Sequence, residues 1–493
     1  MLRLACLAAL CGLAVPTALP AQDPAAATPR TTASRASRPN FVFLLAEGTG
    51  AGWNSLSVAL DDRMPEAKSD AGLTPSLEKL AAEGMRMPSF YVSAPRCTPA
   101  RATLLTGIGA AKLHMTYVNE SGSERRGGAQ ATGGGGGRRR GGQGEPEPAA
   151  EGTGPTTKLL PPSSVSQLPR NLPTIASVLK EAGYATAHLG KWHVGRLAPG
   201  NHGFDLDDGA NTNQGPGRDP KPNPEQGTAI TDRGIEFMRA QVAAGKPFYL
   251  QLSHYGGGSE DEVRAETRQA LAAQLRGMRG KTAWQAGILA DVDANLGRIL
   301  AALDELGIAD STYVVFSTDH GMAGRNSNLP LQGGKGSVME GGVRVPFLVR
   351  GPGIPKGSQA RVLASGADLL PTLADLAGVQ RMPSGIEGGS LAAVWKDPAK
   401  GTVQRPHEEF VVHFPHYDLG SPPASAIWLG DHKLVWLHED DKLQLFDLAK
   451  DPGERRDLAR EEPKRVADLK KRLDAYLEDI DAAMPQPNPA HGK

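Results

Sequence analysis

The segment Phe41-Val-Phe-Leu-Leu-Ala46 is a continuous apolar run that ends in polar and glycine-rich sequence beginning with Glu47 and Gly48. An uninterrupted run of this kind is typical of a strand that is buried on both faces, as central strands of parallel sheets are. Similar runs recur along the chain at 184–189, 247–253, 313–318 and 345–349. The sequence therefore predicts a sheet with several buried strands.

Helical patterns separate these runs. After Pro173, Ile175, Val178 and Leu179 fall on one face of a predicted helix, and a second pattern spans 288–303. Alternating strands and helices predict an α/β/α sandwich around a large, mostly parallel sheet. Ligands of such folds bind beyond the carboxyl ends of the strands, so polar residues that follow the apolar runs are candidate site residues.

The C-terminal part has a different pattern. Beyond about Lys400, short alternating segments occur at 426–429, 433–437 and 444–447, which predict a small antiparallel sheet. From Pro463 to Ile480, apolar residues recur at helical spacing and predict an amphipathic helix on that sheet. We therefore expect a main domain at 38–400, a small C-terminal α+β subdomain at 401–485 and a tail at 486–493.

The first residues predict export. Arg3 precedes an apolar run from Leu4 to Leu19, and Ala21 offers a small residue for cleavage, so 1–21 is predicted to be a signal peptide. The run is too short and too proline-rich to span a bilayer well. Residues 22–37 are predicted to form a flexible leader. We expect a periplasmic or secreted protein with no integral membrane segment after signal removal.

Charge and composition limit the partners. Lys+Arg and Asp+Glu are equal at 54 each, so nothing favours a nucleic-acid or membrane-surface partner. Residues 120–157 are rich in glycine and contain three arginines at 138–140. They predict a disordered surface insertion, and recruitment of a sulfated polymer by the arginines is the alternative.

Cys97 is the only cysteine outside the predicted signal peptide, because Cys6 and Cys11 lie within it. A lone cysteine in an exported protein has three interpretations: a buried free thiol, one half of an intermolecular disulfide, or a residue that takes part in the chemistry of the site. Its surroundings are Cys97-Thr-Pro-Ala-Arg101-Ala-Thr-Leu-Leu-Thr-Gly107. This segment resembles the signature of type I, formylglycine-dependent sulfatases of the alkaline phosphatase superfamily, which is Cys-x-Pro-x-Arg followed by Leu-Thr-Gly.

The resemblance extends along most of the chain. Further segments that are similar to family motifs follow in order at 38–40, 190–195, 202–205, 231–233, 317–321, 333–336, 340–346, 368–374 and 445–454. The resemblance implies an alkaline-phosphatase-like fold. It also implies hydrolysis of aryl or carbohydrate sulfate esters by a formylglycine hydrate made from Cys97, through a sulfated enzyme intermediate. A converting enzyme and a sulfated small molecule or glycan would be the partners.

The resemblance also implies roles for catalytic residues. Arg101 would hold the formylglycine hydrate, while Lys191 and Lys335 would bind sulfate oxygens, where fixed cations stabilise the charge of the transition state. His193 and His254 would transfer protons, since the ordinary pKa of histidine lies near neutrality.

The resemblance implies one Ca²⁺ ion, bound by Glu47, Cys97 as formylglycine, Asp319 and His320. Family members usually have two adjacent aspartates after the first strand, where this chain has Glu47 and Gly48. Because Ca²⁺ takes six to eight oxygens, a lost carboxylate predicts a weaker or differently completed site. Water or a carboxylate at 61 or 62 is a candidate for the missing ligand.

Two other functions stay open on the sequence. Relatives of sulfatases cleave phosphodiesters or phosphonate monoesters with the same scaffold and nucleophile. A catalytically silent binding protein is the second alternative, because a metal carboxylate is lost. The natural substrate is not readable from the motifs, and the segments 211–223 and 413–417 are candidates for the pocket that binds the leaving group.

Overall fold

The structure is a computed structural model that describes residues 38–48, 52–69, 73–118, 156–213, 225–256, 262–272, 281–324 and 327–492. These residues all fall within one compact unit, Arg38–Lys493. The predicted signal peptide, the leader, nearly all of the insertion at 120–157 and most of the segment 211–223 lie outside the described residues.

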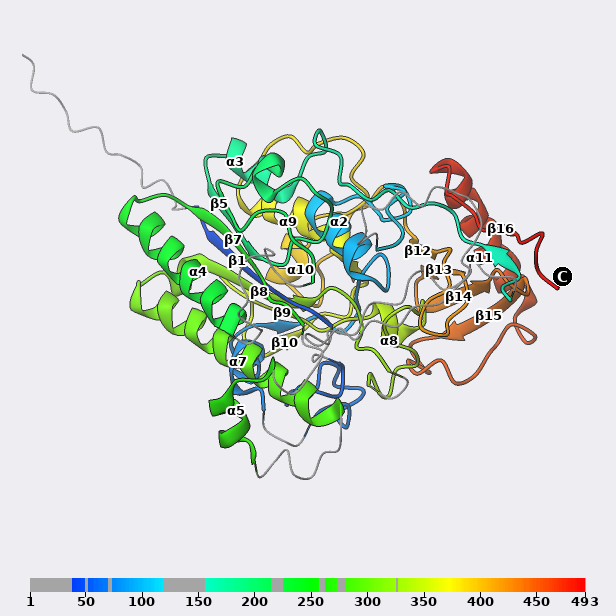
Figure 1. Ribbon diagram of the computed structural model, residues 1–493, viewed down its shortest axis with the longest axis horizontal. Helices are drawn as coiled ribbons and strands as arrows, with labels where there is room; N and C mark the ends of the chain where they lie inside the picture. Colours follow the sequence, from blue (N-terminus) through cyan, green and yellow to red (C-terminus); the bar gives the residue numbers. More distant parts are fainter. Residues whose placement is uncertain are drawn as a thin grey trace, which may run out of the picture. The chain divides into compact units, whose positions relative to one another are not determined.

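A mixed, mostly parallel sheet forms the centre of the unit (Figure 1). Strand β1 (Asn40–Ala46) lies between β7 (Phe248–Ser253) and β8 (Thr312–Thr318) and runs parallel to both. Among the described residues eight strands join this sheet, in the order β10 (Ser358–Gln359), β2 (Met85–Arg86), β9 (Phe347–Arg350), β8, β1, β7, β5 (Ala185–Gly190) and β6 (Leu206–Asp207). The predicted run at 345–349 enters as β9, which is antiparallel to β8.

Side chains of β1 alternate between two cores, which explains why every position from Phe41 to Ala46 is apolar. Phe41, Phe43 and Leu45 pack in one core, and Val42 and Leu44 pack in the other. The first core contains side chains of α2 (Cys97–Thr106), α3 (Ile175–Glu181), α9 (Leu369–Leu376) and α10 (Ala392–Lys396). The second contains side chains of α1 (Pro75–Glu83), α4 (Glu225–Ala243) and α7 (Lys281–Glu305). The predicted α/β/α sandwich is confirmed.

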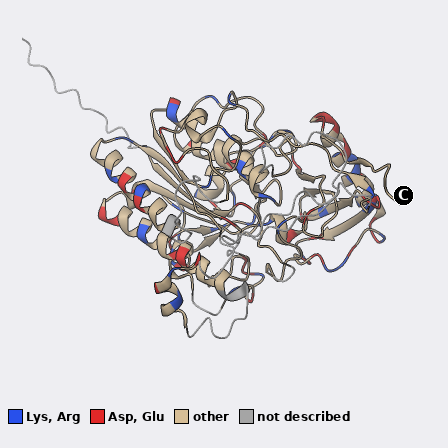
Figure 2. Ribbon diagram, in the orientation of Figure 1, with Lys and Arg blue, Asp and Glu red and all other residues tan. Residues whose placement is uncertain are grey.

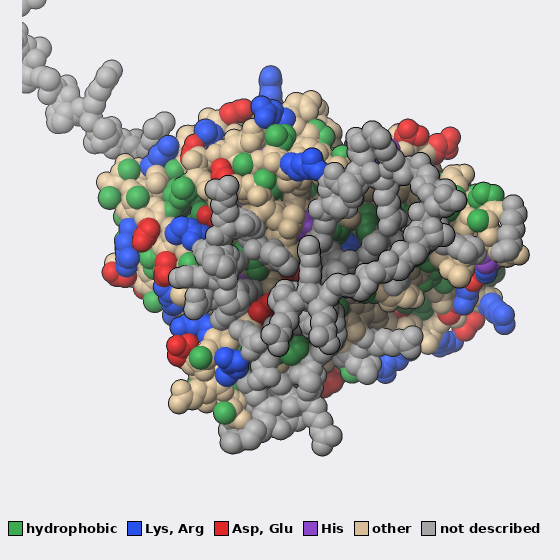
Figure 3. Space-filling model, viewed as in Figure 1, with side chains coloured by type: hydrophobic (Ala, Val, Ile, Leu, Met, Phe, Trp, Pro, Cys, Tyr) green, Lys and Arg blue, Asp and Glu red, His purple; other side chains and the backbone are tan. Residues whose placement is uncertain are grey.

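The surface carries charges of both signs. The ribbon of Figure 2 is coloured for basic and acidic residues along α4 and α7, and side chains of both signs intermingle on the visible face in Figure 3. Within the described ranges, every helix is too short or too polar to cross a membrane.

A smaller antiparallel sheet follows near the C-terminus, as predicted. Its strands are, in order, β12 (Phe410–Phe414), β13 (Ala424–Leu429), β14 (His432–Leu437) and β15 (Lys442–Asp447). Helix α11 (Pro463–Asp479) packs Leu469, Leu473 and Leu477 against this sheet. The remaining short elements are β3 (Phe90–Tyr91), β4 (Leu159–Leu160), α5 (Ala265–Ala270), α8 (Glu340–Val343), β11 (Ala364–Ser365) and β16 (Gln486–Pro487).

A buried ionic network joins the small sheet to the segment that contains α8. Nζ of Lys433, on β14, lies 2.6 Å from Oε1 of Glu454 and 3.1 Å from Oε1 of Glu340, and all three side chains are buried. Nε1 of Trp428 donates to Glu340 as well. Because such contacts tie the two parts together in one unit, the domain boundary near residue 400 stays a proposal.

We predict that Lys433→Ala lowers the free energy of unfolding by about 3–5 kcal/mol, since it removes the cation of the buried Glu454 and leaves Glu340 only Arg344, at 3.6 Å. Lys442→Ala, on the neighbouring strand β15, removes an exposed lysine and should change the free energy of unfolding by less than about 0.5 kcal/mol. Urea unfolding followed by tryptophan fluorescence measures both. Equal stability of the two variants would contradict the prediction.

Candidate active site

Four parallel strands end at the same edge of the sheet. The register aligns the last residues of β1 with those of β7 and β8, and the last residues of β5 with those of β7. Polar residues follow each strand directly at this edge: Glu47 after β1, Lys191 after β5, His254 after β7, and Asp319 and His320 after β8. Parallel pairing thus gathers residues that are up to 273 positions apart, from Glu47 to His320.

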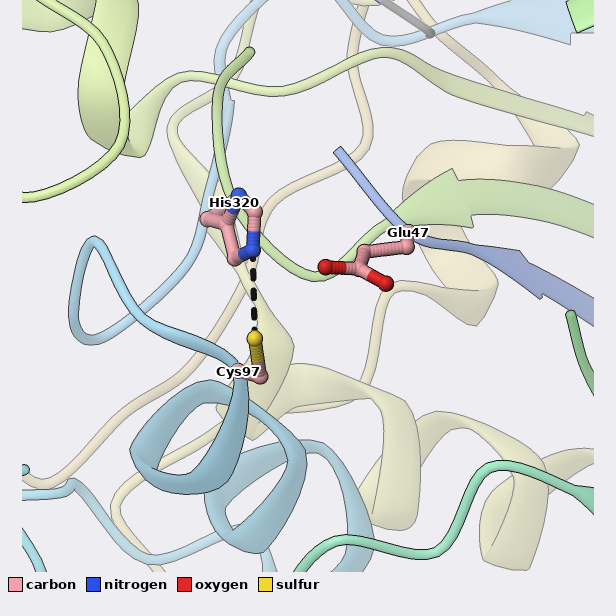
Figure 4. Close-up of side chains that lie close together, drawn as sticks. All are labelled: Glu47, Cys97 and His320. Atoms are coloured by element: carbon pink, nitrogen blue, oxygen red, sulfur yellow. Dashed lines mark hydrogen bonds between the residues drawn. The ribbon is translucent and has the colours of Figure 1, made fainter. Parts of the chain in front are cut away.

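Cys97 faces this edge from the first turn of α2 (Figure 4). Its side chain is buried, and Sγ lies 3.2 Å from Nε2 of His320. Nδ1 of His320 lies 2.9 Å from the carbonyl oxygen of Gly321, which only accepts hydrogen bonds, so Nδ1 carries the proton. In the neutral ring, Nε2 is then the acceptor atom, and it faces the sulfur.

Glu47 reaches toward Cys97 and His320 from the end of β1 (Figure 4). Its Oε2 lies 3.2 Å from Nζ of Lys191 and accepts a hydrogen bond from the backbone of Gly256 at 2.8 Å. Its Oε1 lies 3.7 Å from Nζ of Lys335. Burial works to raise the pKa of Glu47, but the two lysines hold it well below the ordinary value, so the group is a carboxylate.

Arg101 and Asp319 form a buried pair beside the cysteine. Nε of Arg101 donates to Oδ2 of Asp319 at 2.9 Å, and Nη1 donates to the carbonyl oxygen of Lys191 at 2.7 Å. Although burial opposes it, the positive charges of His320, Arg101 and Lys191 lower the pKa of Asp319 to about 2. Arg101 thereby links α2 to the ends of β5 and β8.

The same cations act on the thiol. Burial raises the pKa of Cys97, yet Lys191, Lys335 and His320 outweigh burial and Asp319, and lower the pKa to about 5. Burial works to lower the pKa of Lys191, and Cys97 and Glu47 nevertheless hold it above its usual range. The site is therefore built to stabilise negative charge at position 97.

The two predicted proton-transfer histidines are both buried, and each has a defined contact near the end of its strand. The backbone oxygen of His193 accepts from Oγ1 of Thr98 at 2.8 Å, which ties this left-handed residue to the start of α2. Nε2 of His254 lies 3.2 Å from Oγ1 of Thr231. Burial lowers the pKa of His254 to about 4, so its ring is neutral at pH 7.

Asn211 holds the Lys191–His193 loop in place. Its Oδ1 accepts from the backbone of Trp192 at 2.8 Å, its Nδ2 donates to Gly190 at 2.9 Å, and its carbonyl accepts from the backbone of His193. The sequence offered 211–223 only as a candidate pocket segment, and residues 214–223 lie outside the described part of the chain. No local pattern marks the role of Asn211, because it arises from contacts between distant residues.

A second contact that sequence reasoning missed connects Cys97 to the C-terminal part. Arg96 forms a buried, two-pronged ion pair with Asp418, which follows β12. A Cβ added at Gly336, next to Lys335, would lie 2.8 Å from Oδ2 of Asp418. Asp418 therefore packs against the start of α2 and against the loop that supplies Lys335.

The donor set fits a divalent cation. Glu47, Cys97 and His320 each offer one ligand atom, and these atoms all lie within 4.8 Å of one another. Asp319 is adjacent, with Oδ1 at 3.4 Å from Nε2 of His320. Gly48 contributes only a backbone N–H to Asp319, and a Cβ there would lie 2.2 Å from the carbonyl oxygen of His320. The structure thus has no room for a second carboxylate at position 48.

The carboxylates suggested as substitutes are engaged elsewhere. Asp61 is buried and binds Arg63, Arg344 and Arg361. Burial works to raise the pKa of Asp61, but Arg63 and Arg344 hold it at about 2. The neighbouring Asp62 binds Arg86 at 2.7 Å. Neither joins Glu47, Cys97 and His320 in this structure, so the hypothesis that they complete the metal set is not supported.

Comparisons with known proteins agree with the geometry. A family model described as Sulfatase matches residues 39–379, and one described as N-sulphoglucosamine sulphohydrolase, C-terminal, matches 334–483. The chain is 26% identical to arylsulfatase A of Bos taurus over 91% of this chain and 89% of that protein. It is 30% identical to N-acetylgalactosamine-6-sulfatase of Mus musculus over 69% of this chain and 63% of that protein.

Solved structures share the fold. The structure of Ps i-CgsB in complex with k-i-k-neocarrahexaose matches with a TM-score of 0.68 and 21% identity, covering 89% of this chain and 92% of that one. The PsFucS1 sulfatase from Pseudoalteromonas sp. matches with a TM-score of 0.66 and 22% identity, covering 91% and 92%.

We predict that the Cys97 thiol of metal-free, unconverted protein titrates with a midpoint near pH 5, because the surrounding cations favour the thiolate. Lys191→Met should raise the midpoint by removing one of them. The measurement is the ultraviolet absorbance of the thiolate against pH, with Cys97→Ser protein as the reference that subtracts all other groups. A midpoint near the ordinary 9.0 would refute this electrostatic account.

Proposed function

We propose, from the premise that the chain belongs to the sulfatase family and hydrolyses sulfate esters, that Cys97 is the precursor of a formylglycine whose hydrate attacks the sulfur atom. The observation that carries this is the position of residue 97: a buried first turn of α2, 3.2 Å from His320 and within the field of Lys191 and Lys335. A formylglycine oxygen would stand where Sγ stands now. The second hydroxyl of the hydrate would then expel sulfate by re-forming the aldehyde.

Lys191 and Lys335 are proposed to bind the sulfuryl oxygens. Nζ of Lys191 lies 3.2 Å from Oε2 of Glu47, and Nζ of Lys335 lies 3.7 Å from Oε1. The Lys191 side chain is fully buried. Negative charge spreads over those oxygens as the sulfuryl group transfers, and fixed cations in a buried site stabilise it without reorganisation. Arg101 is held by Asp319 and would orient the hydrate.

His193 and His254 are proposed to move protons. His193 would take the proton of the attacking hydroxyl, since its loop is tied to Thr98 next to the nucleophile. His254 is neutral at pH 7 in the free enzyme. The negative charge of a bound sulfate ester would raise its pKa and so favour a protonated ring that can donate to the departing alkoxide.

A single Ca²⁺ ion is the proposed metal of the converted enzyme. Glu47, Asp319, His320 and the oxygens of residue 97 would hold it, and it would supply positive charge beside the transferring group. Only two of these side chains are carboxylates, which is fewer than an ordinary calcium site has. We therefore expect water to complete the coordination and the affinity to be modest.

A sulfated sugar is the proposed substrate. An open pocket of about 500 Å³ is lined by Tyr417 and Glu439 together with hydroxyl and glycine residues, and Tyr417 precedes the Asp418 that binds Arg96. An aromatic ring with hydroxyls and a carboxylate suits the mixed surface of a sugar. The names of N-acetylgalactosamine-6-sulfatase and of the neocarrahexaose complex favour the same class. Export to the periplasm or the outside, and a converting enzyme that acts on Cys97, complete the proposal.

Cys97→Ala is expected to lower kcat/KM for sulfate esters by at least about 10³-fold, because it removes the nucleophile. Lys335→Ala should cost about 10²–10³-fold as one stabilising charge is lost, whereas the exposed Lys356→Ala should have no effect. Initial rates on a panel of sulfated sugars, aryl sulfates and aryl phosphodiesters measure this.

Mass spectrometry of the Cys97 peptide, from a host that contains a converting enzyme, accompanies the assay. Formylglycine is expected at this position. A thiol in fully active enzyme would refute the proposed nucleophile, and a preference for phosphodiesters by orders of magnitude would favour the phosphodiesterase alternative.

Removal of divalent ions by a chelator should lower the activity of converted enzyme, and Ca²⁺ should restore it, because the buried carboxylates otherwise attract the lysines needed for sulfate. The activity is titrated against free Ca²⁺. Full activity in protein that elemental analysis finds free of divalent ions would exclude this role.

A further inference from the structure

We propose that the unconverted chain, with Cys97 as a thiol, binds Zn²⁺ through Sγ of Cys97, Nε2 of His320 and the carboxylate of Glu47, and that the state of residue 97 decides which ion the site prefers. Zinc binding by the thiol form goes beyond the proposed function and does not depend on it, whereas the change of preference on conversion rests on it.

The first observation is the distance between the two softest donors. A tetrahedral zinc ion separates a sulfur and a nitrogen ligand by about 3.6 Å, from ordinary Zn–S and Zn–N bond lengths. Sγ of Cys97 and Nε2 of His320 lie 3.2 Å apart, so a shift of a few tenths of an ångström suffices. The hydrogen bond of Nδ1 to Gly321 points Nε2 at this position, so an ion that displaces the proton of Nε2 meets its lone pair, as a ligand histidine requires.

The third donor is Glu47. Its ligand atom lies within 4.8 Å of both others. Oε2 accepts a hydrogen bond from Gly256 and lies 3.2 Å from Lys191, while Oε1 lies 3.7 Å from Lys335, which is beyond hydrogen-bond distance. Oε1 is therefore the oxygen available to an ion. Three protein ligands and a water molecule make an ordinary four-coordinate zinc site.

Gly48 is the second observation. A side chain there would collide with His320, since an added Cβ would lie 2.2 Å from its carbonyl oxygen and 2.5 Å from Nδ1. Glycine thus makes room for an imidazole and at the same time removes an oxygen donor. The site loses the hard ligand that calcium favours and keeps the nitrogen and sulfur that zinc favours.

Conversion of Cys97 would reverse this preference. It replaces the thiolate sulfur by oxygens, so the donor set changes from sulfur, nitrogen and oxygen to oxygen and nitrogen. Calcium does not bind thiolate sulfur appreciably, whereas zinc binds it strongly. The thiol form should hold zinc in the presence of excess Ca²⁺, and the converted form should not.

The test uses the full chain produced without a converting enzyme, with the thiol at residue 97 verified by mass. After metal removal, the protein is titrated with Zn²⁺ against a fluorescent zinc indicator, with and without millimolar Ca²⁺. Co²⁺ is substituted in a parallel sample and read by its thiolate charge-transfer absorption. We expect one Zn²⁺ per chain, no displacement by Ca²⁺, and a charge-transfer band.

Variants distinguish residues that bind the zinc ion from residues that do not. His320→Ala and Cys97→Ala should each weaken zinc binding more than about 100-fold, the upper end of what a change next to a ligand costs. Cys97→Ser, nearly equal in shape, should abolish the cobalt band while circular dichroism reports a folded chain. His407→Ala, at a histidine that lies beside Glu409 and Tyr476, should not change zinc binding.

Zinc binding that survives Cys97→Ser and His320→Ala, or Ca²⁺ that displaces Zn²⁺ from the thiol form, would overturn the inference. Both results are independent of hydrolysis. A chain that binds zinc as proposed but shows no activity after conversion would count against the proposed function alone.

Discussion

The parallel pairing of β5, β7, β1 and β8 is the constraint on which the site depends. Hydrogen bonds fix the register of these strands, and the register aligns their carboxyl ends at one edge. The chain must turn away there, and the first residues beyond each strand carry the polar side chains. A one-residue slip of β1 would move Glu47 away from Lys191 and would also exchange the side chains that face the two cores. Packing of the cores therefore also fixes the geometry of the site.

Burial makes the charges of this edge mutually dependent. Lys191, Asp319 and Arg101 are almost fully buried, and each would cost several kcal/mol as an isolated ion. They persist because opposite charges are adjacent, as the lowered pKa of Asp319 and the raised pKa of Lys191 indicate. The arrangement leaves the region around position 97 favourable to an anion, which is what a reaction that transfers a negatively charged group requires.

Glu47, Gly48 and His320 form one structural unit. A Cβ at position 48 would meet both the backbone oxygen and the imidazole of His320, so the packing requires glycine there. Glu47, Cys97 and His320 offer ligand atoms within 4.8 Å of one another at this place. Sulfatases usually have an aspartate where this chain has Gly48, and the close packing of His320 leaves no space for that side chain here. The glycine is therefore part of an ordered local arrangement.

The sequence by itself determined the order of strands and helices, the α/β/α layers and the motif around Cys97. The reason is that apolar runs and helical periodicity are local properties of a chain. The runs at 41–46, 184–189, 247–253 and 313–318 all became parallel strands of the large sheet. Only the tertiary structure decided that 345–349 pairs antiparallel, that Asp61 serves arginines rather than a metal, and that Asn211 and Asp418 position the site. Those outcomes depend on contacts between residues far apart in the chain, and the spacing of residue types along a sequence does not encode which buried carboxylate meets which cation.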